Sequence, residues 1–218
     1  MSAPGATDRR ALAASQAPKA SRWPRTERRR ARIAAVLARR QPDLTVVLEN
    51  IHDPHNVSAI LRTCDAVGVL KAHAVYTVEM PPTGAFARTT SASAAKWVEV
   101  HQHDSVTGCI ATLRREGFTV LASAIGPEAR PLYDLDLTSP VAIVLGNEMR
   151  GVSDEALNLA DGRLEIPMVG MVQSLNVSVA GAVCLYEAFR QRLAAGLYEA
   201  SRLESGQLAT LEQAWLER

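Results

Sequence analysis

The chain has 218 residues, of which 47% are hydrophobic, so it can bury one substantial core in a single main domain with short extensions. No apolar run approaches the length of a membrane span, and we therefore expect a soluble cytoplasmic protein without a membrane partner. The three cysteines are far apart and odd in number, which favours reduced, buried thiols over a disulfide framework or a metal cluster.

The formal net charge of +1 hides a strong asymmetry along the chain. Residues 1–40 hold eleven Lys or Arg against two acidic residues, whereas residues 41–218 hold thirteen against twenty-one. A basic segment beside an acidic body is expected of a protein that binds a polyanion such as RNA. An organellar transit peptide or a merely solvated charged face are the alternatives for this segment. The candidate RNA-binding residues nearest the folded part are Arg28, Arg29, Arg30, Arg32, Arg39 and Arg40.

Local patterns along the chain predict an α/β protein. Residues 1–24 have the composition of a disordered basic arm, and residues 25–42 predict a basic helix with Ile33, Val36 and Leu37 on one side. We expect strands at 44–49, 71–76, 97–101, 118–124, 141–145 and 163–166. We expect helices from Pro54 to Val67, over 105–116 and 153–159, and from Val177 onward. This alternation within 43–195 predicts an open, mostly parallel sheet covered by helices, with a helical extension at 196–218.

Three segments carry most of the functional signal, and they are residues 56–64, 144–153 and 170–181. In the third, Ser174 is placed to cap a helix whose free amide groups could bind polar groups of a ligand. The small residues that follow Ser174 predict close packing against another backbone, in the same chain or in a second copy. The glycine turn of the second segment is not a Walker phosphate loop, because Val152-Ser153 follows its last glycine in place of Lys and Ser or Thr.

These three segments, in this order and at these separations, resemble the signature motifs of the SPOUT class of RNA methyltransferases. The similarity runs from about residue 28 to about residue 198, and residues 38–46 most resemble the tRNA ribose 2'-O-methyltransferases of the TrmH family, which modify guanosine 18. The resemblance implies a Rossmann-like sheet with a deep trefoil knot at 123–183, a homodimer, tRNA as substrate and S-adenosylmethionine as methyl donor, without a metal. Methylation of ribosomal RNA and RNA binding without catalysis are the alternatives.

The resemblance also implies roles for individual residues. The implied catalytic residues are Asn56, Arg62, Glu148, Ser174 and Asn176. The implied cofactor-binding residues are Ser123, Gly146, Asn147, Ile166, Met168, Ser174 and Leu175. Arg62 matches the family's assigned base, but a guanidinium with a pKa above about 12 seldom loses its proton, so orienting a phosphate and stabilising an alkoxide is the second interpretation. A surface arginine paired with Ser58 or Asp65 is the third.

Histidines provide one further candidate site. His101 and His103 alternate as neighbours on one face of a strand do, and they could share a metal ion. Because no cysteine or carboxylate cluster is nearby in the sequence, we interpret them as ordinary surface histidines.

Overall fold

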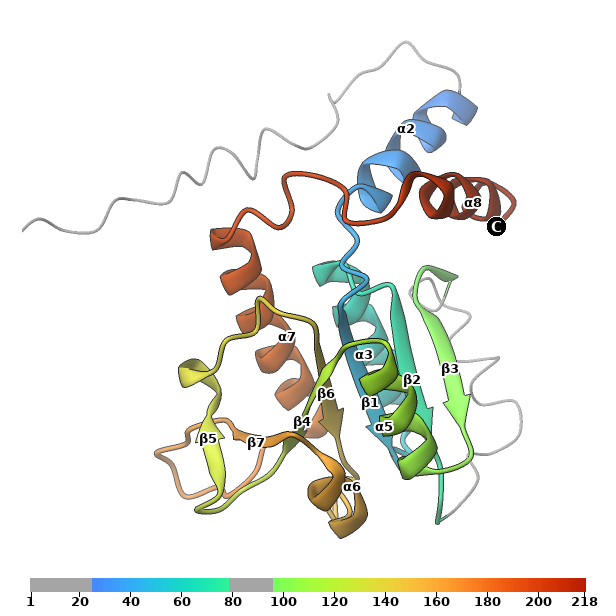
Figure 1. Ribbon diagram of the computed structural model, residues 1–218. Coiled ribbons are helices and arrows are strands. Elements are labelled where there is room, and N and C mark those ends of the chain that lie inside the picture. The colour runs from blue at the N-terminus through green and yellow to red at the C-terminus, as the bar shows by residue number, and fades with distance from the viewer. Residues whose placement is uncertain (1–24, 79–95) are drawn as a thin grey trace, which may run out of the picture.

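The computed structural model describes residues 25–78 and 96–218, and its centre is a seven-stranded sheet (Figure 1). The strands follow the order β3-β2-β1-β6-β4-β7-β5, and every neighbouring pair is parallel. Helices supply the crossover connections from β1 to β2, from β3 to β4 and from β6 to β7. The predicted parallel α/β sheet is thereby confirmed, whereas the predicted arm at 1–24 lies outside the described residues.

The elements agree with the predicted ones to within a few residues. The strands are β1 (Leu44–Glu49), β2 (Lys71–Val75), β3 (Glu99–His103), β4 (Thr119–Ser123), β5 (Ala129–Pro131), β6 (Val141–Leu145) and β7 (Gly162–Glu165). The helices are α2 (Arg25–Leu37), α3 (Pro54–Val67), α5 (Val106–Arg115), α6 (Asp154–Leu159), α7 (Val177–Ala194) and α8 (Ser205–Leu216), with a 3-10 turn, η2 (Leu132–Asp134). The sequence did not predict β5 and η2, because three residues each are too few to show a period.

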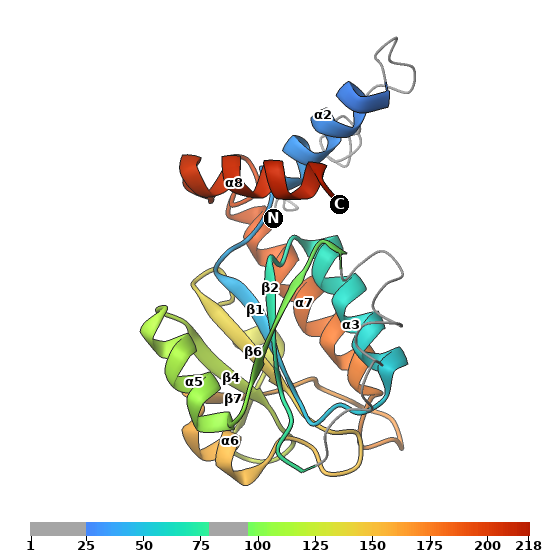
Figure 2. The same ribbon diagram turned by 90° about the vertical axis from the view of Figure 1, so that its right-hand side faces the viewer.

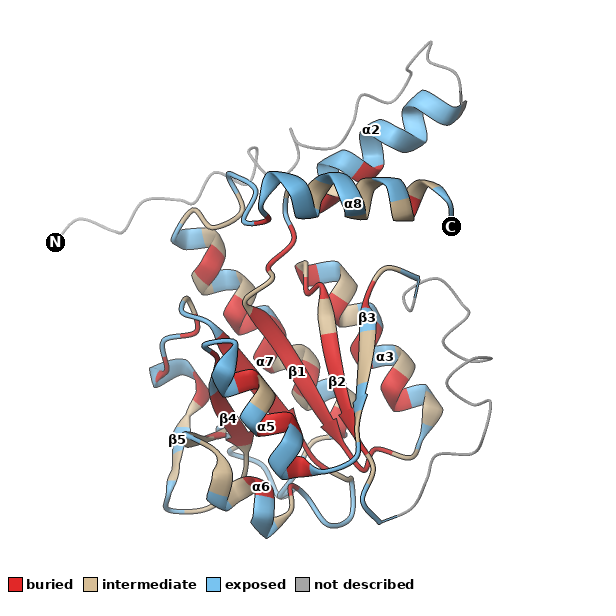
Figure 3. Cartoon of the chain, turned by 45° about the vertical axis from the view of Figure 1, so that its right-hand side comes forward, coloured by how far each residue is buried: buried red, intermediate tan, exposed pale blue. Residues whose placement is uncertain are grey.

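Side chains of the central strands alternate between two cores. Leu48 and Ile143 pack with residues of α3 and α7, whereas Val47 and Val144 pack with residues of α5 and α6. The two helix pairs lie on opposite sides of the sheet in Figure 2. Figure 3 shows β1 and most of β2 as buried. Burial on both faces explains the apolar run from Val46 to Leu48 in β1, where a half-exposed strand would alternate.

The terminal helices form a third, smaller packing unit above the sheet. Ile33 and Leu37 of α2 are buried against Trp215 of α8, and the Trp215 ring lies 4.9 Å from that of Trp97 between centroids. Helix α8 lies within the segment 196–218, for which the sequence predicts a helical extension. Across the described segments, no helix combines the length and the apolar character that crossing a membrane would require.

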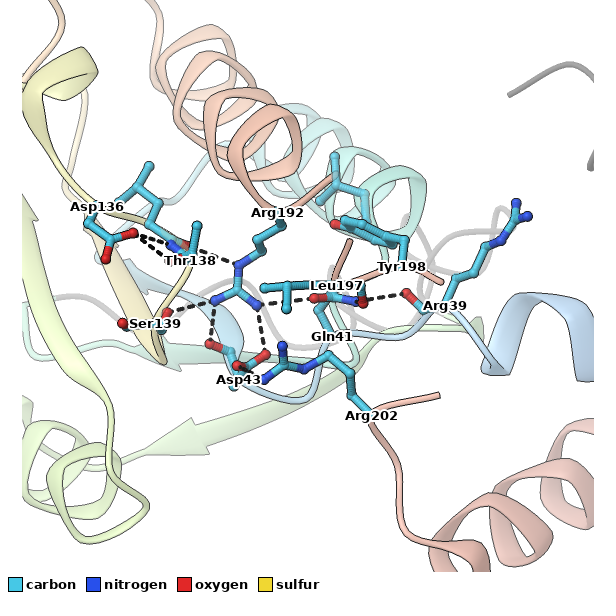
Figure 4. Close-up of polar contacts among 12 residues, drawn as sticks. Arg39, Gln41, Asp43, Asp136, Thr138, Ser139, Arg192, Leu197, Tyr198 and Arg202 are labelled. Atoms are coloured by element: carbon cyan, nitrogen blue, oxygen red, sulfur yellow. Dashed lines mark hydrogen bonds and ion pairs between the residues drawn. The ribbon is translucent and has the colours of Figure 1, made fainter. Parts of the chain in front are cut away.

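A buried arginine fastens α7 to the amino-terminal ends of β1 and β6 (Figure 4). Arg192 is fully buried, and its Nε donates to the carbonyl of Leu137 at 2.9 Å. Its Nη1 donates to Gln41 Oε1 at 3.2 Å and to Asp43 Oδ1 at 2.7 Å. Its Nη2 donates to the carbonyls of Asp43 at 3.1 Å and Ser139 at 2.7 Å. Each of the five N–H groups of the guanidinium therefore has an acceptor.

Candidate active site

The carboxyl ends of four neighbouring strands, β1, β6, β4 and β7, lie at the edge of the sheet opposite Arg192. This is the lower end of β1 and β6 in Figure 1. Loops follow β1, β6 and β7 there, and they contain or lead into the three motif segments. In open parallel sheets, ligands bind at this edge. The topology therefore brings the three motifs to the place where a site is expected.

A chain of side-chain hydrogen bonds joins the three motifs. Asn56, in the first turn of α3, donates from Nδ2 to Glu148 Oε1 at 2.6 Å. Asn176, directly before α7, donates from Nδ2 to Asn56 Oδ1 at 3.1 Å. The side chain of Asn56 is nearly buried between these partners. Three of the five predicted catalytic residues are thus in direct contact, although they are 92 and 120 positions apart along the chain.

The start of α7 differs from the prediction. Asn176, rather than Ser174, is the cap, since its Oδ1 accepts hydrogen bonds from the Ser178 amide at 2.9 Å and the Ser178 hydroxyl at 2.6 Å. Asparagine is as good a cap as serine, and only the residue immediately before the first helical residue can reach these groups. Ser174 is exposed, two residues earlier. Its predicted role as the cap is therefore wrong.

The loop after β6 is closed tightly around Gly146. Asn147 and Gly151 exchange two backbone hydrogen bonds of 3.0 and 2.8 Å. A Cβ atom on Gly146 would lie 2.2 Å from the backbone nitrogen of Val152, so no other residue fits there without moving the loop. Asn147 fixes the loop further, because its Nδ2 donates to the Asn50 carbonyl at 2.9 Å. The glycine at 146 is therefore what allows this loop to close on itself.

Gly181, near the start of α7, packs closely as predicted, but the predicted neighbour, another backbone, is wrong. A Cβ atom on Gly181 would lie 2.9 Å from Cδ1 of Leu145 and 3.5 Å from Cγ1 of Ile60. The close neighbours are therefore side chains of β6 and α3 in the same chain, rather than another backbone. This contact brings the first turns of α7 and α3 together.

The predicted cofactor-binding residues lie along this edge of the sheet. Ser123 ends β4, Gly146 follows β6, and Ile166 and Met168 follow β7. Leu175 lies in the same connection to α7 as Met168, and both side chains are partly buried. Outside the helices and strands of the described residues, no backbone–backbone hydrogen bond involves residues 167–175. The peptide groups of this connection can therefore serve a ligand.

Arg62 is not part of this group of residues. It is exposed on α3, and among the described residues it has no hydrogen bond or ion pair. The suggested pairing of Arg62 with Asp65 is wrong, because Asp65 Oδ1 binds Arg40 Nη2 at 2.5 Å. Arg62 thus remains available to a partner outside the chain.

The predicted RNA-binding arginines fall into two groups. Arg28, Arg29, Arg30, Arg32 and Arg39 are all exposed. Two of them contact α8, since Arg30 Nε lies 3.1 Å from Glu212 Oε1 and Arg29 Nη2 donates to the Trp215 carbonyl at 3.4 Å.

Arg40 forms the other group, and its predicted contact with RNA is wrong. The side chain is fully buried, and its guanidinium lies 5.0 Å from the centroid of the Trp215 ring. It donates to the Val69 carbonyl at 2.9 Å, besides its ion pair with Asp65. Burial lowers the pKa of Arg40, whereas the hydrogen bond from Arg40 to Asp65 opposes this shift. Arg40 therefore holds the end of α2 onto the sheet domain.

Glu49 is a residue of the site that the sequence analysis took only as the end of a strand. It is almost fully buried, and its Oε2 accepts a hydrogen bond from the Ser153 amide at 3.0 Å. The sequence pattern that could have indicated this role is a single acidic residue at the end of a mostly apolar strand. Glu49 holds the far end of the loop that begins at Gly146.

Comparisons with known proteins agree with this geometry. Residues 43–186 match the model of the SpoU rRNA Methylase family. The chain is 54% identical over 194 residues to a tRNA (guanosine(18)-2'-O)-methyltransferase of Thermus thermophilus, which covers 89% of this chain and 98% of that protein.

Solved structures give the same result. The crystal structure of the A. aeolicus TrmH/SpoU tRNA modifying enzyme superposes with a TM-score of 0.77 at 36% identity, covering 88% of this chain and 96% of that one. The SpoU methyltransferase AviRb from Streptomyces viridochromogenes, in complex with the cofactor AdoMet, superposes with a TM-score of 0.58 at 26% identity, covering 72% and 61%. The chain therefore belongs to the SpoU methylase family.

Proposed function

We propose that this protein is a cytoplasmic S-adenosylmethionine-dependent methyltransferase that modifies a ribose 2'-hydroxyl in tRNA, with guanosine 18 as its target. The observation that carries the proposal is the hydrogen-bonded chain Asn176–Asn56–Glu148, which joins all three motifs at the carboxyl edge of the sheet. The activity named for the Thermus relative supports the choice of substrate.

The residues at this edge fit the cofactor. Gly146 lets the loop after β6 close tightly at this edge, and the connection at 167–175 offers peptide groups that no other backbone group uses. Ser123, Gly146, Asn147, Ile166, Met168, Ser174 and Leu175 would hold S-adenosylmethionine. The cofactor supplies an electrophilic methyl group to the ribose 2'-oxygen. A deep trefoil knot over 123–183 belongs to the same proposal, supported by the return of α7 from the β7 side of the sheet to α3.

Asn56 and Glu148 act as positioning residues in this proposal. Glu148 is acceptor-only when ionised, so it fixes which way the Asn56 amide points. Holding the 2'-oxygen in line with the methyl group supplies much of the acceleration expected from such a site. Ser174 is exposed in the connection that leads to α7, which supports a role in contacting the substrate.

Arg62 acts on the ribose or its phosphate. With no partner among the described residues, its guanidinium can orient the phosphate and stabilise the developing alkoxide. To take the proton of the 2'-hydroxyl, the side chain would first have to lose one of its own. In a homodimer, Arg62 of the second copy would complete the site. Exposed apolar side chains support such an interface, since Val179 and Tyr186 on α7 are 48% and 53% exposed and Met171 before α7 is fully exposed. A surface of this kind marks an interaction site.

The exposed arginines of α2 would bind the tRNA backbone. Arg28, Arg29, Arg30, Arg32 and Arg39 lie on or directly after one helix, and phosphate contacts from such residues position RNA without reading its sequence.

The test is transfer of labelled methyl from S-adenosylmethionine to an unmodified tRNA transcript, compared with a transcript changed only at guanosine 18. We expect label in the first alone. Arg62→Ala should lower the rate at least about 100-fold, as loss of a group acting at the reacting oxygen does. The matched control is Arg115→Ala, an exposed arginine on α5 at the opposite face.

Three outcomes would contradict the proposal. Label retained on the changed tRNA would move the target to another nucleotide, and label in ribosomal RNA alone would move it to another RNA. An Arg62→Ala variant as active as Arg115→Ala would remove Arg62 from the reaction.

A further inference from the structure

Two histidines and a cysteine converge on the face of the sheet that α5 covers. His73 is in β2, His103 is in β3 and Cys109 is in α5. One potential ligand atom from each of the three residues lies within 4.8 Å of the other two. His73 Nδ1 and His103 Nε2 are 2.9 Å apart, and the two rings are stacked with centroids 5.1 Å apart. These two nitrogens share a hydrogen bond, and an ion bound by both histidines would replace it.

The fold brings these three residues together from separate elements, so local sequence patterns do not show the group. His73 is paired in register with His101, and His103 follows on the same face of the edge strand β3. The nearest cysteine comes from the helix that packs over these strands, and it is fully buried. The sequence indicates ordinary surface histidines, because no cysteine is close to them along the chain. In the folded chain, Cys109 is close to His73 and His103 in space.

We propose that His73, His103 and Cys109 bind one zinc ion that clamps the edge strand β3 and helix α5 to β2. Two imidazole nitrogens and one thiolate are ligands that suit zinc and exclude magnesium or calcium, which prefer oxygen.

The geometry needs only small adjustments. With Zn–N near 2.0–2.1 Å and Zn–S near 2.3 Å, ligand atoms around a tetrahedral ion are about 3.3 to 3.6 Å apart. The 2.9 Å separation of the two nitrogens must widen slightly, and the thiol must move inward by about 1 Å at most, given the 4.8 Å limit. His103 is partly exposed, which gives an ion a path from solvent. The fourth position would be open to water.

Neighbouring groups favour this ligand set. His101 Nε2 lies 2.8 Å from Glu99 Oε1 on its own strand, so His101 has a different partner. Burial raises the pKa of the Cys109 thiol to about 12, so the ion must displace this proton when it binds. The cluster lies beneath α5, whereas the proposed active site lies at the carboxyl edge between α3 and α7. The inference therefore does not rest on the proposed methyl transfer.

Cobalt(II) is the probe, added to the full chain without a histidine tag after treatment with a chelator. We expect one Co²⁺ per chain, with a sulfur-to-metal charge-transfer band in the near ultraviolet. Cys109→Ala should abolish the band, and His103→Ala should weaken Co²⁺ and Zn²⁺ binding at least about tenfold. Matched controls are Cys184→Ala, another fully buried thiol, and His101→Ala, a histidine on the same strand face.

Thermal unfolding gives a second measurement that needs no colour. Zinc at about 100 times the wild-type dissociation constant should raise the ratio of folded to unfolded wild-type protein about 100-fold, and that of His103→Ala by about tenfold or less. Circular dichroism checks that each variant is folded. Absence of a Co–thiolate band in the wild type, or a band as strong in Cys109→Ala as in Cys184→Ala, would overturn the proposal. So would equal losses of affinity in His101→Ala and His103→Ala.

Discussion

Replacing Arg192 by lysine keeps the positive charge but removes the planar guanidinium that reaches several acceptors at once. The guanidinium donates five hydrogen bonds, to the carbonyls of Leu137, Asp43 and Ser139 and to the side chains of Gln41 and Asp43. An ammonium group has three donors at a single point, so at least two acceptors lose their partner. A buried acceptor without a partner costs about 1–3 kcal/mol. We therefore expect Arg192→Lys to lower the free energy of unfolding by about 2–4 kcal/mol.

The matched control is the same substitution two residues earlier on the same helix. Arg190 is 67% exposed and pairs with Glu187, and exposed pairs contribute about 0–1 kcal/mol. Urea unfolding followed by circular dichroism measures both variants. Asp43 keeps its ion pair with Arg202 at 2.6 Å, so the loss reports mainly on the carbonyls and not on an orphaned carboxylate. If Arg192→Lys were no less stable than Arg190→Lys, the reasoning from buried hydrogen bonds would be refuted.

Two further predictions concern the glycine loop and α7. Gly146→Ala should break the two backbone bonds between Asn147 and Gly151, lowering stability by roughly 1–3 kcal/mol and weakening S-adenosylmethionine binding, which calorimetry measures. Gly206→Ala in α8, where the added Cβ meets nothing within 4 Å, is its control, and equal affinity for S-adenosylmethionine in both variants would contradict this prediction. Glu187→Gln should be less stable than wild type at neutral pH. The hydrogen bond from Arg190 lowers the pKa of Glu187, burial opposes this shift, and the hydrogen bond from Gln191 adds to it. A carboxylate with a lowered pKa stabilises the fold at pH values above its pKa in the unfolded chain, which is about 4.3 for glutamate. The difference in unfolding free energy between wild type and variant should therefore shrink as the pH falls below about 4.3. A difference that stays constant with pH in denaturation curves would count against this prediction.

The elements were predictable where a local pattern repeats. The apolar run at 141–145 and the Asp53-Pro54 start of α3 both lie where the sequence placed them. Contacts between distant segments were not predictable from local patterns. Nothing in the sequence separates Arg40 from its exposed neighbours, because its two partners, Asp65 and Trp215, are far from it along the chain. The motifs identified Asn56, Glu148 and Asn176 by resemblance, but only the fold shows that they touch.

Asn176 carries a restriction that neither of its contacts imposes alone. As a helix cap it must offer an acceptor to Ser178, and as a neighbour of Asn56 it must offer a donor. Serine and aspartate can satisfy the first demand, but ionised aspartate has no proton to give in the second. The Glu148 carboxylate therefore fixes the orientation of the Asn56 amide, and the Asn56 oxygen in turn accepts from the Asn176 amide at the first turn of α7. The Ser178 amide imposes the same orientation from the other end, because it requires the Asn176 oxygen as its acceptor. The first turn of α7 thus contributes to the polar order of the active site as much as Glu148 does.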